Sequence, residues 1–169
     1  MSAAAALTAL SALGGEGSAL AVGIDVVDAE RLGTIVARRG QPLRDRLFTP
    51  VEQALCEGAS PRYRTYCMAG RLAAKEAVRK ALGPHGRGVG WLEVEIGRAA
   101  SGEPLPRLSG RAQAALRLAG FGGFRLSIAH EAGVAVAIAL ALGAPGGTHI
   151  SEGAAVGAAL GVGDNTDET

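Results

Sequence analysis

The stretch "SPRYRTYCMAGRLAAKEAVRKALGP", residues 60–84, predicts the long helix on which the rest of the chain is built. The Ser-Pro pair at its start is typical of the N-cap and first position of a helix. The Gly-Pro pair after Leu82 favours a left-handed turn and removes a backbone donor, so the helix should end there. We therefore expect one long helix at 61–82.

The faces of this helix differ in polarity. Its apolar positions include Leu72, Ala73, Ala77, Ala81 and Leu82. Glu76 follows Leu72 by four residues, so it lies at the edge of the apolar stripe, with Lys80 one turn further on. The other basic residues form a row at i, i+4 spacing, made of Arg71, Lys75 and Arg79. Two interpretations remain open: a solvated helix with a Glu76–Lys80 surface pair, or a carboxylate that faces a site.

The stretch "GIDVVD", residues 23–28, reads as a buried strand with Asp25 in its middle. An isolated carboxylate there would be costly, or would take up a proton. If the fold brought Asp25 and Glu76 together, they would repel each other unless a cation lay between them. Two carboxylates, with waters and phosphate oxygens of a ligand, make a typical Mg²⁺ site.

The remaining elements predict an α+β fold. Strands are expected at 20–27, 91–96, 124–129 and 134–142, with a short one in "SGEPLPRL". Asp28 should cap a helix that ends before Gly40, "TPVE" at 49–52 should start a second helix, and Ser109 should cap the last one. This order does not alternate as in a parallel α/β fold, so we expect a mostly antiparallel sheet.

Composition predicts one domain between two tails. The chain has 169 residues, of which 48% are hydrophobic and 4% aromatic, so small aliphatic side chains must fill its core. Residues 1–19 lack Lys and Arg and read as a poorly ordered leader. Residues 143–169 are Gly/Ala-rich and acidic and read as a disordered tail. The expected domain is therefore 20–142.

Charge is concentrated in that domain. The chain has a net charge of +1, but residues 20–142 hold all 17 basic and only 11 of the 16 acidic residues, a net +6 that suggests an anionic substrate or partner. Arg31 and Arg38 share a face with Ile35 on the expected first helix. That face is either solvated or a docking surface for an acidic helix. Nucleic acid is disfavoured because the patch is short and has no interleaved aromatic residues.

Other features limit the class of protein. Cys56 and Cys67 fit neither a disulfide framework nor a zinc spacing, so we expect reduced thiols in a cytoplasmic protein. We see no signal peptide, and no apolar run long enough to cross a membrane. His130 ends a strand beside the turn "HEAG", where it is either structural or presented to a cleft.

Three motifs together resemble the holo-(acyl carrier protein) synthase family, the small type of 4′-phosphopantetheinyl transferase. They are "GIDVVD", "GRLAAKEAVRKALG" and "LSIAHE", and they appear in the family's order over about residues 22–140. The resemblance implies transfer of phosphopantetheine from coenzyme A to the serine of an apo carrier protein, with release of adenosine 3′,5′-bisphosphate. The carrier could belong to fatty-acid, polyketide or peptide synthesis.

The resemblance also implies residue roles. Asp25 and Glu76 are the expected ligands of Mg²⁺, or alternatively Mn²⁺, and Glu76 is the route for the serine proton. His130 is expected at coenzyme A as a catalytic residue. The other expected coenzyme A contacts are Lys80, Arg71 and Gly83, and the expected carrier-docking residues are Arg31 and Arg38.

Small members of the family are homotrimers with active sites between subunits, so the Asp25–Glu76 pair should face groups of a neighbour. Two departures from the family pattern concern coenzyme A: Ala129 replaces a hydroxyl residue and Glu103 replaces a basic one. Two other interpretations stay open. One is a module that binds coenzyme A or a carrier without turnover, and the other is a purely structural trimer.

Overall fold

The computed structural model describes residues 19–58 and 60–144. The predicted leader and tail lie outside these residues, apart from Ala19, Gly143 and Ala144, and remain predictions. The strands are β1 (Ala19–Asp28), β2 (Val94–Arg98), β3 (Pro104–Leu108), β4 (Phe121–Glu131) and β5 (Val134–Gly143). The α-helices are α2 (Ala29–Arg39), α3 (Gln41–Leu47), α4 (Pro50–Cys56), α5 (Pro61–Ala81) and α6 (Gly110–Leu118), with the 3₁₀ turns η1 (Gly83–Gly86) and η2 (Trp91–Glu93).

The strands form two antiparallel sheets, which confirms the predicted α+β class. One sheet has the order β1-β5-β4, and the other is the hairpin-like pair β2-β3. In the three-stranded sheet, Asp25 lies opposite Ala137 and His130 lies opposite Ala135. Because side chains at paired positions share a face, both residues point to the same side of the sheet as these alanines.

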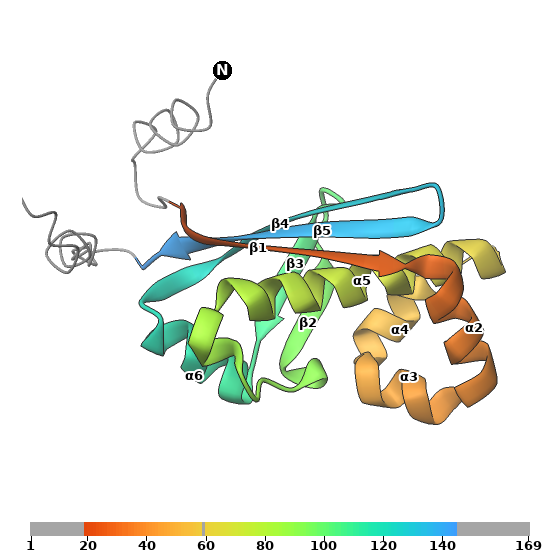
Figure 1. Ribbon diagram of the computed structural model, residues 1–169, viewed down its shortest axis with the longest axis horizontal. Helices are drawn as coiled ribbons and strands as arrows, with labels where there is room; N and C mark the ends of the chain where they lie inside the picture. The colour runs from red at the N-terminus through yellow and green to blue at the C-terminus, as the bar shows by residue number, and fades with distance from the viewer. Residues whose placement is uncertain (1–18, 59, 145–169) are drawn as a thin grey trace, which may run out of the picture.

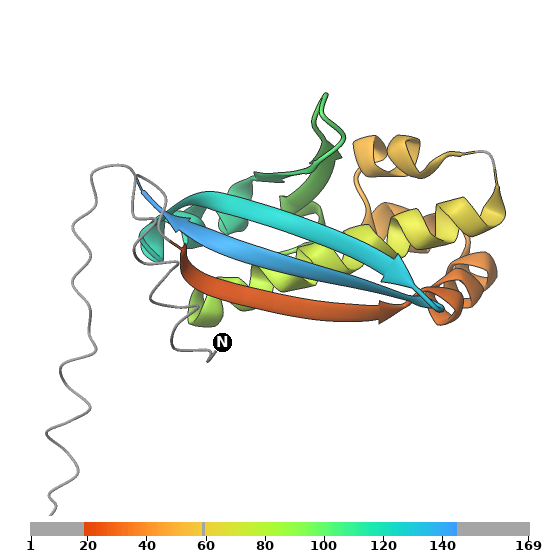
Figure 2. The same ribbon diagram turned by 90° about the horizontal axis from the view of Figure 1, so that it is seen from above.

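Helix α5 lies along that side, under the three strands (Figures 1 and 2). The β5 residues that face it are alanines with no exposed surface, at positions 135, 137, 139 and 141. On β1 the approach is closer still, because a Cβ at Gly23 would lie 2.0 Å from the carbonyl oxygen of Ala77. Small residues therefore let the long helix pack almost directly on the strand backbones.

The opposite side of this sheet is apolar but uncovered in the described part of the chain. The β1 residues on it, Val22, Ile24 and Val26, are 62%, 53% and 57% exposed. Their partners on β5 are Leu140, Ile138 and Val136, so the aliphatic surface continues from β1 onto β5. A contiguous exposed apolar face of this kind is typical of an association surface.

Local signals correctly predicted most helix ends. The Asp28 carboxylate accepts the backbone N–H of Arg31 at 2.9 Å and caps α2. Thr49 and Glu52 form the expected capping box of α4. The prediction of only two helices before α5 was wrong, since Gln41–Leu47 forms the additional helix α3. Its Pro42 lies in the first turn, where proline is tolerated.

The interpretation of α5 as a solvated helix fails at Lys75. Its side chain is fully buried, with Nζ 2.6 Å from Oε2 of Glu52, which is also fully buried. The ammonium group donates two further hydrogen bonds, to the carbonyls of Leu47 and Trp91. Burial lowers the pKa of Lys75, and Glu52 opposes that shift. The pair ties α4 to α5 inside the protein.

The predicted strand at 91–96 starts later than expected, because residues 91–93 form the 3₁₀ turn η2. This turn places Glu93 beside α6, where its carboxylate accepts the backbone N–H groups of Gly90 at 2.6 Å and Arg111 at 2.9 Å. Ser109 occupies the N-cap position, but its side chain makes no capping bond. Glu93 therefore caps α6, a role that was predicted for Ser109.

Replacing Glu93 by glutamine should lower the melting temperature at pH 7 by a few degrees. These N–H groups hold the pKa of Glu93 below its ordinary value. A carboxyl whose pKa is lowered by folding stabilises the protein above its unfolded pKa, and this contribution is lost as the pH falls through the folded pKa. The difference between wild type and Glu93→Gln should thus shrink below about pH 4.5. Circular dichroism melts from pH 7 to 3 measure it, with the exposed Glu103→Gln as control. A difference independent of pH would contradict this assignment.

A candidate active site in two parts

The carboxylate of Asp25 faces α5 and is paired there. Its Oδ1 lies 2.8 Å from Nζ of Lys80, which also donates to the carbonyl of Ile24 at 3.0 Å. The Asp25 side chain is 17% exposed and that of Lys80 50%. The sequence predicted that an Asp25 carboxylate in the middle of a strand would need a cation or a proton. In the structure the Lys80 ammonium group lies beside it.

Glu76 lies one turn before Lys80 on α5, but the two do not form the surface pair that one of the two interpretations proposed. Oε2 of Glu76 instead pairs with Nη1 of Arg79 at 2.9 Å. The Arg79 guanidinium lies over the Trp91 ring, 4.6 Å from its centroid. Asp25 and Glu76 each use one oxygen in these pairs, and their second oxygens are the atoms that could ligate a metal. This donor set fits Mg²⁺, which takes one or two carboxylates and otherwise water and phosphate oxygens.

Asp28, three residues after Asp25, caps α2 as predicted and is not part of this group. We call Asp25, Glu76 and Lys80 the acidic group. Lys80 joins this group to β1 through Asp25, and Glu76 lies one turn before Lys80 on α5.

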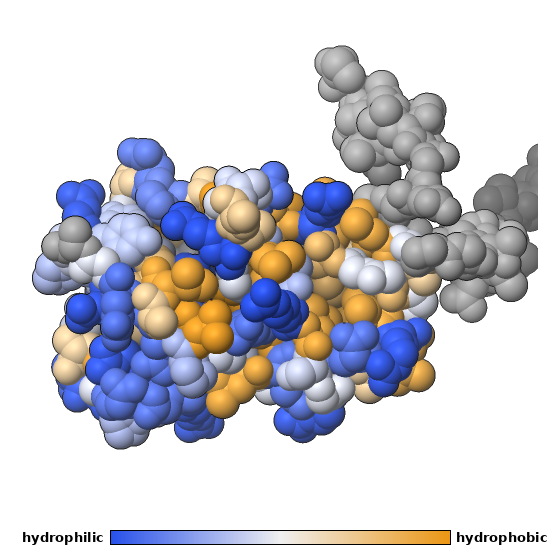
Figure 3. Space-filling view, turned by 180° about the vertical axis from the view of Figure 1, so that it is seen from behind, coloured by the Kyte–Doolittle hydropathy of each residue, from blue (hydrophilic) through white to orange (hydrophobic). Residues whose placement is uncertain are grey.

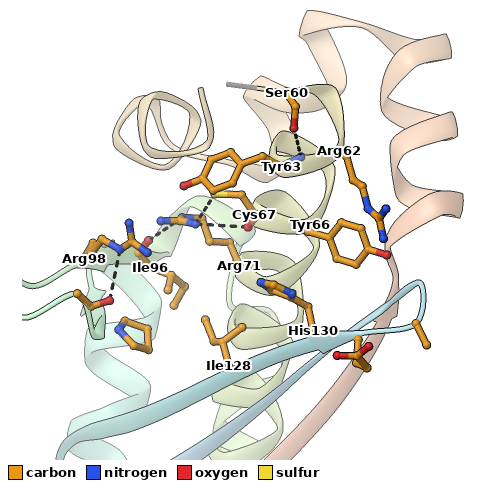
Figure 4. Close-up of a pocket in the computed structure, with 16 residues that line it drawn as sticks. Ser60, Arg62, Tyr63, Tyr66, Cys67, Arg71, Ile96, Arg98, Ile128 and His130 are labelled. Atoms are coloured by element: carbon orange, nitrogen blue, oxygen red, sulfur yellow. Dashed lines mark hydrogen bonds between the residues drawn. The ribbon is translucent and has the colours of Figure 1, made fainter. Parts of the chain in front are cut away.

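A pocket of about 540 Å³ opens on the other side of α5, between its first half, β2 and the end of β4. Its lining includes the cationic or ionisable side chains Arg62, Arg71, Arg98 and His130 (Figure 4). Three guanidinium groups around one pocket favour an anionic ligand, and arginine suits phosphate in particular. We call this the arginine pocket.

Arg71 is fixed in the wall of the arginine pocket. Its Nε donates to the carbonyl of Ile96 at 3.1 Å, and its Nη1 to the carbonyl of Cys67 at 3.3 Å. These bonds join α5 to β2 and hold the guanidinium in one orientation (Figure 4). A fixed guanidinium loses little side-chain entropy when it binds an anion.

His130 points into the same pocket from the end of β4, as the interpretation of a strand end at a cleft proposed. Its ring lies against that of Tyr66, with 5.4 Å between the centroids. The Tyr66 hydroxyl accepts the backbone N–H of Gly133 at 3.1 Å and so anchors the β4–β5 turn to α5. The Arg62 guanidinium group lies over the Tyr66 ring, 5.5 Å from the ring centroid.

Sequence reasoning missed Arg62, Tyr66 and Arg98. Arg62 and Tyr66 are four residues apart on the predicted helix, and that spacing could have placed them on one face. Nothing in the sequence places Arg98 beside them, because it is the last residue of β2, a strand that only the tertiary fold brings near.

The acidic group and the arginine pocket do not meet within one chain. The lining of the pocket contains none of Asp25, Glu76 and Lys80. Helix α5 lies between them, with β1 beside one flank and β4 beside the other (Figure 2). The predicted site residues therefore form two separate clusters on opposite sides of the long helix.

The other predicted residues lie outside both clusters. Gly83 follows α5 with φ of +56°, the left-handed conformation that favours glycine. Arg31 and Arg38 are exposed on α2. Seen from behind, the end of the molecule that holds α2 to α4 is largely hydrophilic, whereas the part that holds the sheet is more apolar (Figure 3).

Among the described residues, no helix is long and apolar enough to cross a membrane. The same residues contain no cluster of three or more His, Cys, Asp or Glu side chains able to hold a metal ion. A metal held by Asp25 and Glu76 would therefore need water or phosphate oxygens to complete its coordination.

Residues 21–139 match the family model of the 4′-phosphopantetheinyl transferase superfamily. Similar proteins include the holo-[acyl-carrier-protein] synthase of Desulforudis audaxviator, 41% identical over 73% of this chain and 93% of its own. That of Streptomyces griseus is 42% identical over 73% and 98%. The solved structure of the Helicobacter pylori synthase in complex with coenzyme A is 28% identical, with a TM-score of 0.59 over 71% of this chain and 98% of that one. The Plasmodium yoelii synthase gives 25% identity and a TM-score of 0.64 over 75% and 97%.

Proposed function

The chain belongs to the 4′-phosphopantetheinyl transferase superfamily and is an enzyme of that kind, and on this basis we propose that it transfers phosphopantetheine from coenzyme A to the serine of an apo acyl carrier protein. Adenosine 3′,5′-bisphosphate is the second product. The observation that carries the proposal is that the acidic group and the arginine pocket both lie along α5, the helix that holds the most specific motif. Together they offer metal ligands and phosphate contacts, the two requirements of phosphoryl transfer.

Asp25 and Glu76 would hold Mg²⁺, or Mn²⁺, through the oxygens that Lys80 and Arg79 do not occupy. Such a metal neutralises negative charge on the pyrophosphate that is broken. Lys80 is placed beside the same carboxylates and would contact the phosphates.

Glu76 is the group that would accept the serine proton, directly or through a water. Arg71 and His130 would bind the phosphates of coenzyme A in the arginine pocket, with Gly83 as a further contact from the end of α5. Fixed guanidinium groups orient the pyrophosphate for attack, which reduces the entropic part of the barrier.

Arg31 and Arg38 would dock the acidic helix of the carrier. Both are exposed on α2, at the hydrophilic end of the molecule (Figure 3). Complementary charge mainly raises the association rate and selects the partner, so the same surface can serve several carriers.

We further propose a homotrimer in which the acidic group of one subunit meets the arginine pocket of its neighbour. Two observations support it. The two clusters are separated by α5 within one chain, and the sheet face around Val22, Ile24 and Val26 is apolar and uncovered in the described residues. Association through this face would bury the aliphatic surface and complete the site.

The variant Ile24→Lys should be monomeric and should lose most of its transfer activity. A lysine in the middle of an apolar interface costs several kcal/mol of association energy. Light scattering after gel filtration should give about 17 kDa for the variant, against about three times the 16.9 kDa chain mass for wild type. The control is Leu118→Lys, at an exposed apolar residue on α6. A wild-type protein that is already monomeric and active would overturn this arrangement.

The transferase proposal is tested with a panel of apo carriers from fatty-acid, polyketide and peptide synthesis. Each is incubated with the protein, coenzyme A and Mg²⁺ and analysed by intact mass. We expect at least one carrier to gain the mass of one phosphopantetheine group, and to fail to do so when Mg²⁺ is chelated. No mass gain on any carrier would contradict the proposal.

Melting curves separate the alternatives when no transfer is seen. A module that binds coenzyme A without turnover should be stabilised by it, because a ligand that binds only the folded state raises the melting temperature. A purely structural trimer should respond to neither coenzyme A nor Mg²⁺. The transferase should respond to both.

A further inference from the structure

The arginine pocket contains a thiol that the proposed transfer does not use. Cys67 lies on α5 and contributes to the pocket lining. Its Sγ is 2.8 Å from Nη1 of Arg71 (Figure 4). The same sulfur is 3.5 Å from the carbonyl oxygen of Leu55. The second cysteine, Cys56, ends α4 next to Leu55 and is 1% exposed. One sulfur is therefore open to the pocket, and the other is enclosed behind it.

The surroundings shift the pKa values of the two cysteines in opposite directions. A hydrogen bond from the Cys56 thiol and the charge of Arg71 lower the pKa of Cys67 to about 7. Tyr63 and Arg98 act in the same direction, and burial opposes them. The contact with Cys67, burial and the charge of Glu52 raise the pKa of Cys56 well above its ordinary value. The charge of Arg71 acts in the opposite direction. Near neutral pH the nucleophilic thiolate is that of Cys67.

The pocket also selects the reagent that can reach this thiolate. Arg62, Arg71, Arg98 and His130 line it, so an anionic molecule is attracted and a cationic one repelled. Glu131 is the acidic residue of the lining, at the rim beside the β4–β5 turn. The same charges that would bind coenzyme A therefore concentrate small anions beside the sulfur of Cys67.

We propose that Cys67 is a modification site that exchanges with small anionic disulfides entering the arginine pocket. The Cys67 thiolate forms a bond to one sulfur of the disulfide. The bond between the two reagent sulfurs breaks, and the second half leaves as a thiolate with the electron pair. Cys67 is oxidised to a mixed disulfide and the departing half is reduced, so no further oxidant is needed. The thiol proton of Cys67 passes to the solvent.

The adduct should persist and should close the site. The Cys56 thiol is protonated at neutral pH and buried, so it does not displace the adduct to form an internal disulfide. The attached group occupies the space above Arg71 and removes the thiolate that contacts it. This consequence rests on the proposed function: an occupied pocket cannot bind the phosphates of coenzyme A, and a thiol reductant restores binding.

The modification is tested on the full chain with 5,5′-dithiobis(2-nitrobenzoate), an anionic disulfide, and 2,2′-dithiodipyridine, a neutral one. We expect one equivalent of fast reaction per folded chain, with a rate that rises through a midpoint near pH 7. The expected product is a single adduct by intact mass. Each rate is compared with the rate at which free glutathione reacts with the same reagent. Cys67 should react at least tenfold faster than glutathione with the anionic reagent, and the factor should be smaller with the neutral one.

Variants assign the sulfur and the charge. Cys67→Ser should abolish the fast reaction, and the matched variant Cys56→Ser should retain it. Arg71→Met should slow it and move its midpoint to higher pH. Reaction at Cys56, no reaction in the folded protein, or a mass loss of two hydrogens in place of an adduct would each overturn the proposal.

A separate arm tests the link to the proposed function. Coenzyme A should slow the labelling of Cys67, and labelled protein should lose most of its transfer activity and recover it with dithiothreitol. The Cys67→Ser variant treated with the same reagent should keep the transfer activity of its own untreated sample. Rapid single-site labelling without protection by coenzyme A would leave the modification site established and would refute the assigned contents of the pocket.

Discussion

The variant Glu76→Gln is expected to transfer phosphopantetheine at least about 100-fold more slowly than wild type. The change removes the negative charge that would hold the metal and the base that would accept the serine proton, and proton transfer alone typically contributes 10²–10⁴-fold. Glu76 lies on a partly exposed face of α5 and pairs there with Arg79. Because exposed pairs add little stability, the variant should fold normally.

Three readouts separate this effect from a loss of fold. The melting temperature of Glu76→Gln without ligands should match that of wild type, and the stabilisation by Mg²⁺ should be lost. Asp25→Asn should behave in the same way, since Asp25 is the second proposed ligand. The matched control is Glu57→Gln, at an exposed residue after α4 and outside both clusters. A Glu76→Gln rate within threefold of wild type would refute the assigned mechanism.

The variant Lys75→Ala is expected to lose about 3–5 kcal/mol of unfolding free energy, the usual cost of removing one partner of a buried ion pair. Glu52 would remain fully buried without its cation. The carbonyl groups of Leu47 and Trp91 would also lose the hydrogen bonds that the Lys75 ammonium group donates to them. Urea unfolding measures the change, and a small change in slope would show that the folded state is otherwise similar.

A second substitution tests whether the charge on Glu52 causes this loss. The double variant Lys75→Met with Glu52→Gln replaces the ammonium by an apolar chain of similar length and neutralises the carboxylate. The Glu52 carboxylate accepts the backbone N–H groups of Thr49 and Ile96. The side-chain oxygen of the glutamine can still accept one of the two. The double variant should therefore be more stable than Lys75→Ala. A loss below 1 kcal/mol in Lys75→Ala would show that the pair is not the anchor described here.

Features decided by neighbours in sequence were predictable. Asp28, Thr49 and Ser60 cap their helices because an N-cap bond spans only three residues. The apolar run at 20–27 correctly predicted most of strand β1. These predictions used only local geometry, and no tertiary contact overrides them.

Features decided by distant contacts were not predictable from one sequence. Lys75 resembles a surface lysine by its spacing, and only the arrival of α4 buries it against Glu52. Ser109 has the right residue type to cap α6, but Glu93 reaches the helix start from η2 and takes that role. One interpretation of the sequence paired Glu76 with Lys80, whereas in the fold Lys80 pairs with Asp25 on β1.

The candidate site shows the same division. The motifs identified the acidic group, Arg71 and His130, but they did not indicate that α5 would separate them. They also missed Arg62, Tyr66 and Arg98, because the arginine pocket is built from three elements that are far apart along the chain. Because α5 separates the acidic group from the arginine pocket, it must be tested whether one site takes these two clusters from different subunits.

Mixed trimers answer that question most directly. Glu76→Gln destroys the acidic group and His130→Ala impairs the arginine pocket, so each variant alone should transfer slowly. If sites form between subunits, co-expression of the two variants at equal levels pairs an intact acidic group with an intact pocket at about a quarter of the interfaces. The account predicts that the mixture recovers about a quarter of wild-type transfer, measured by intact mass of the carrier. A mixture no more active than the two separate variants would contradict it.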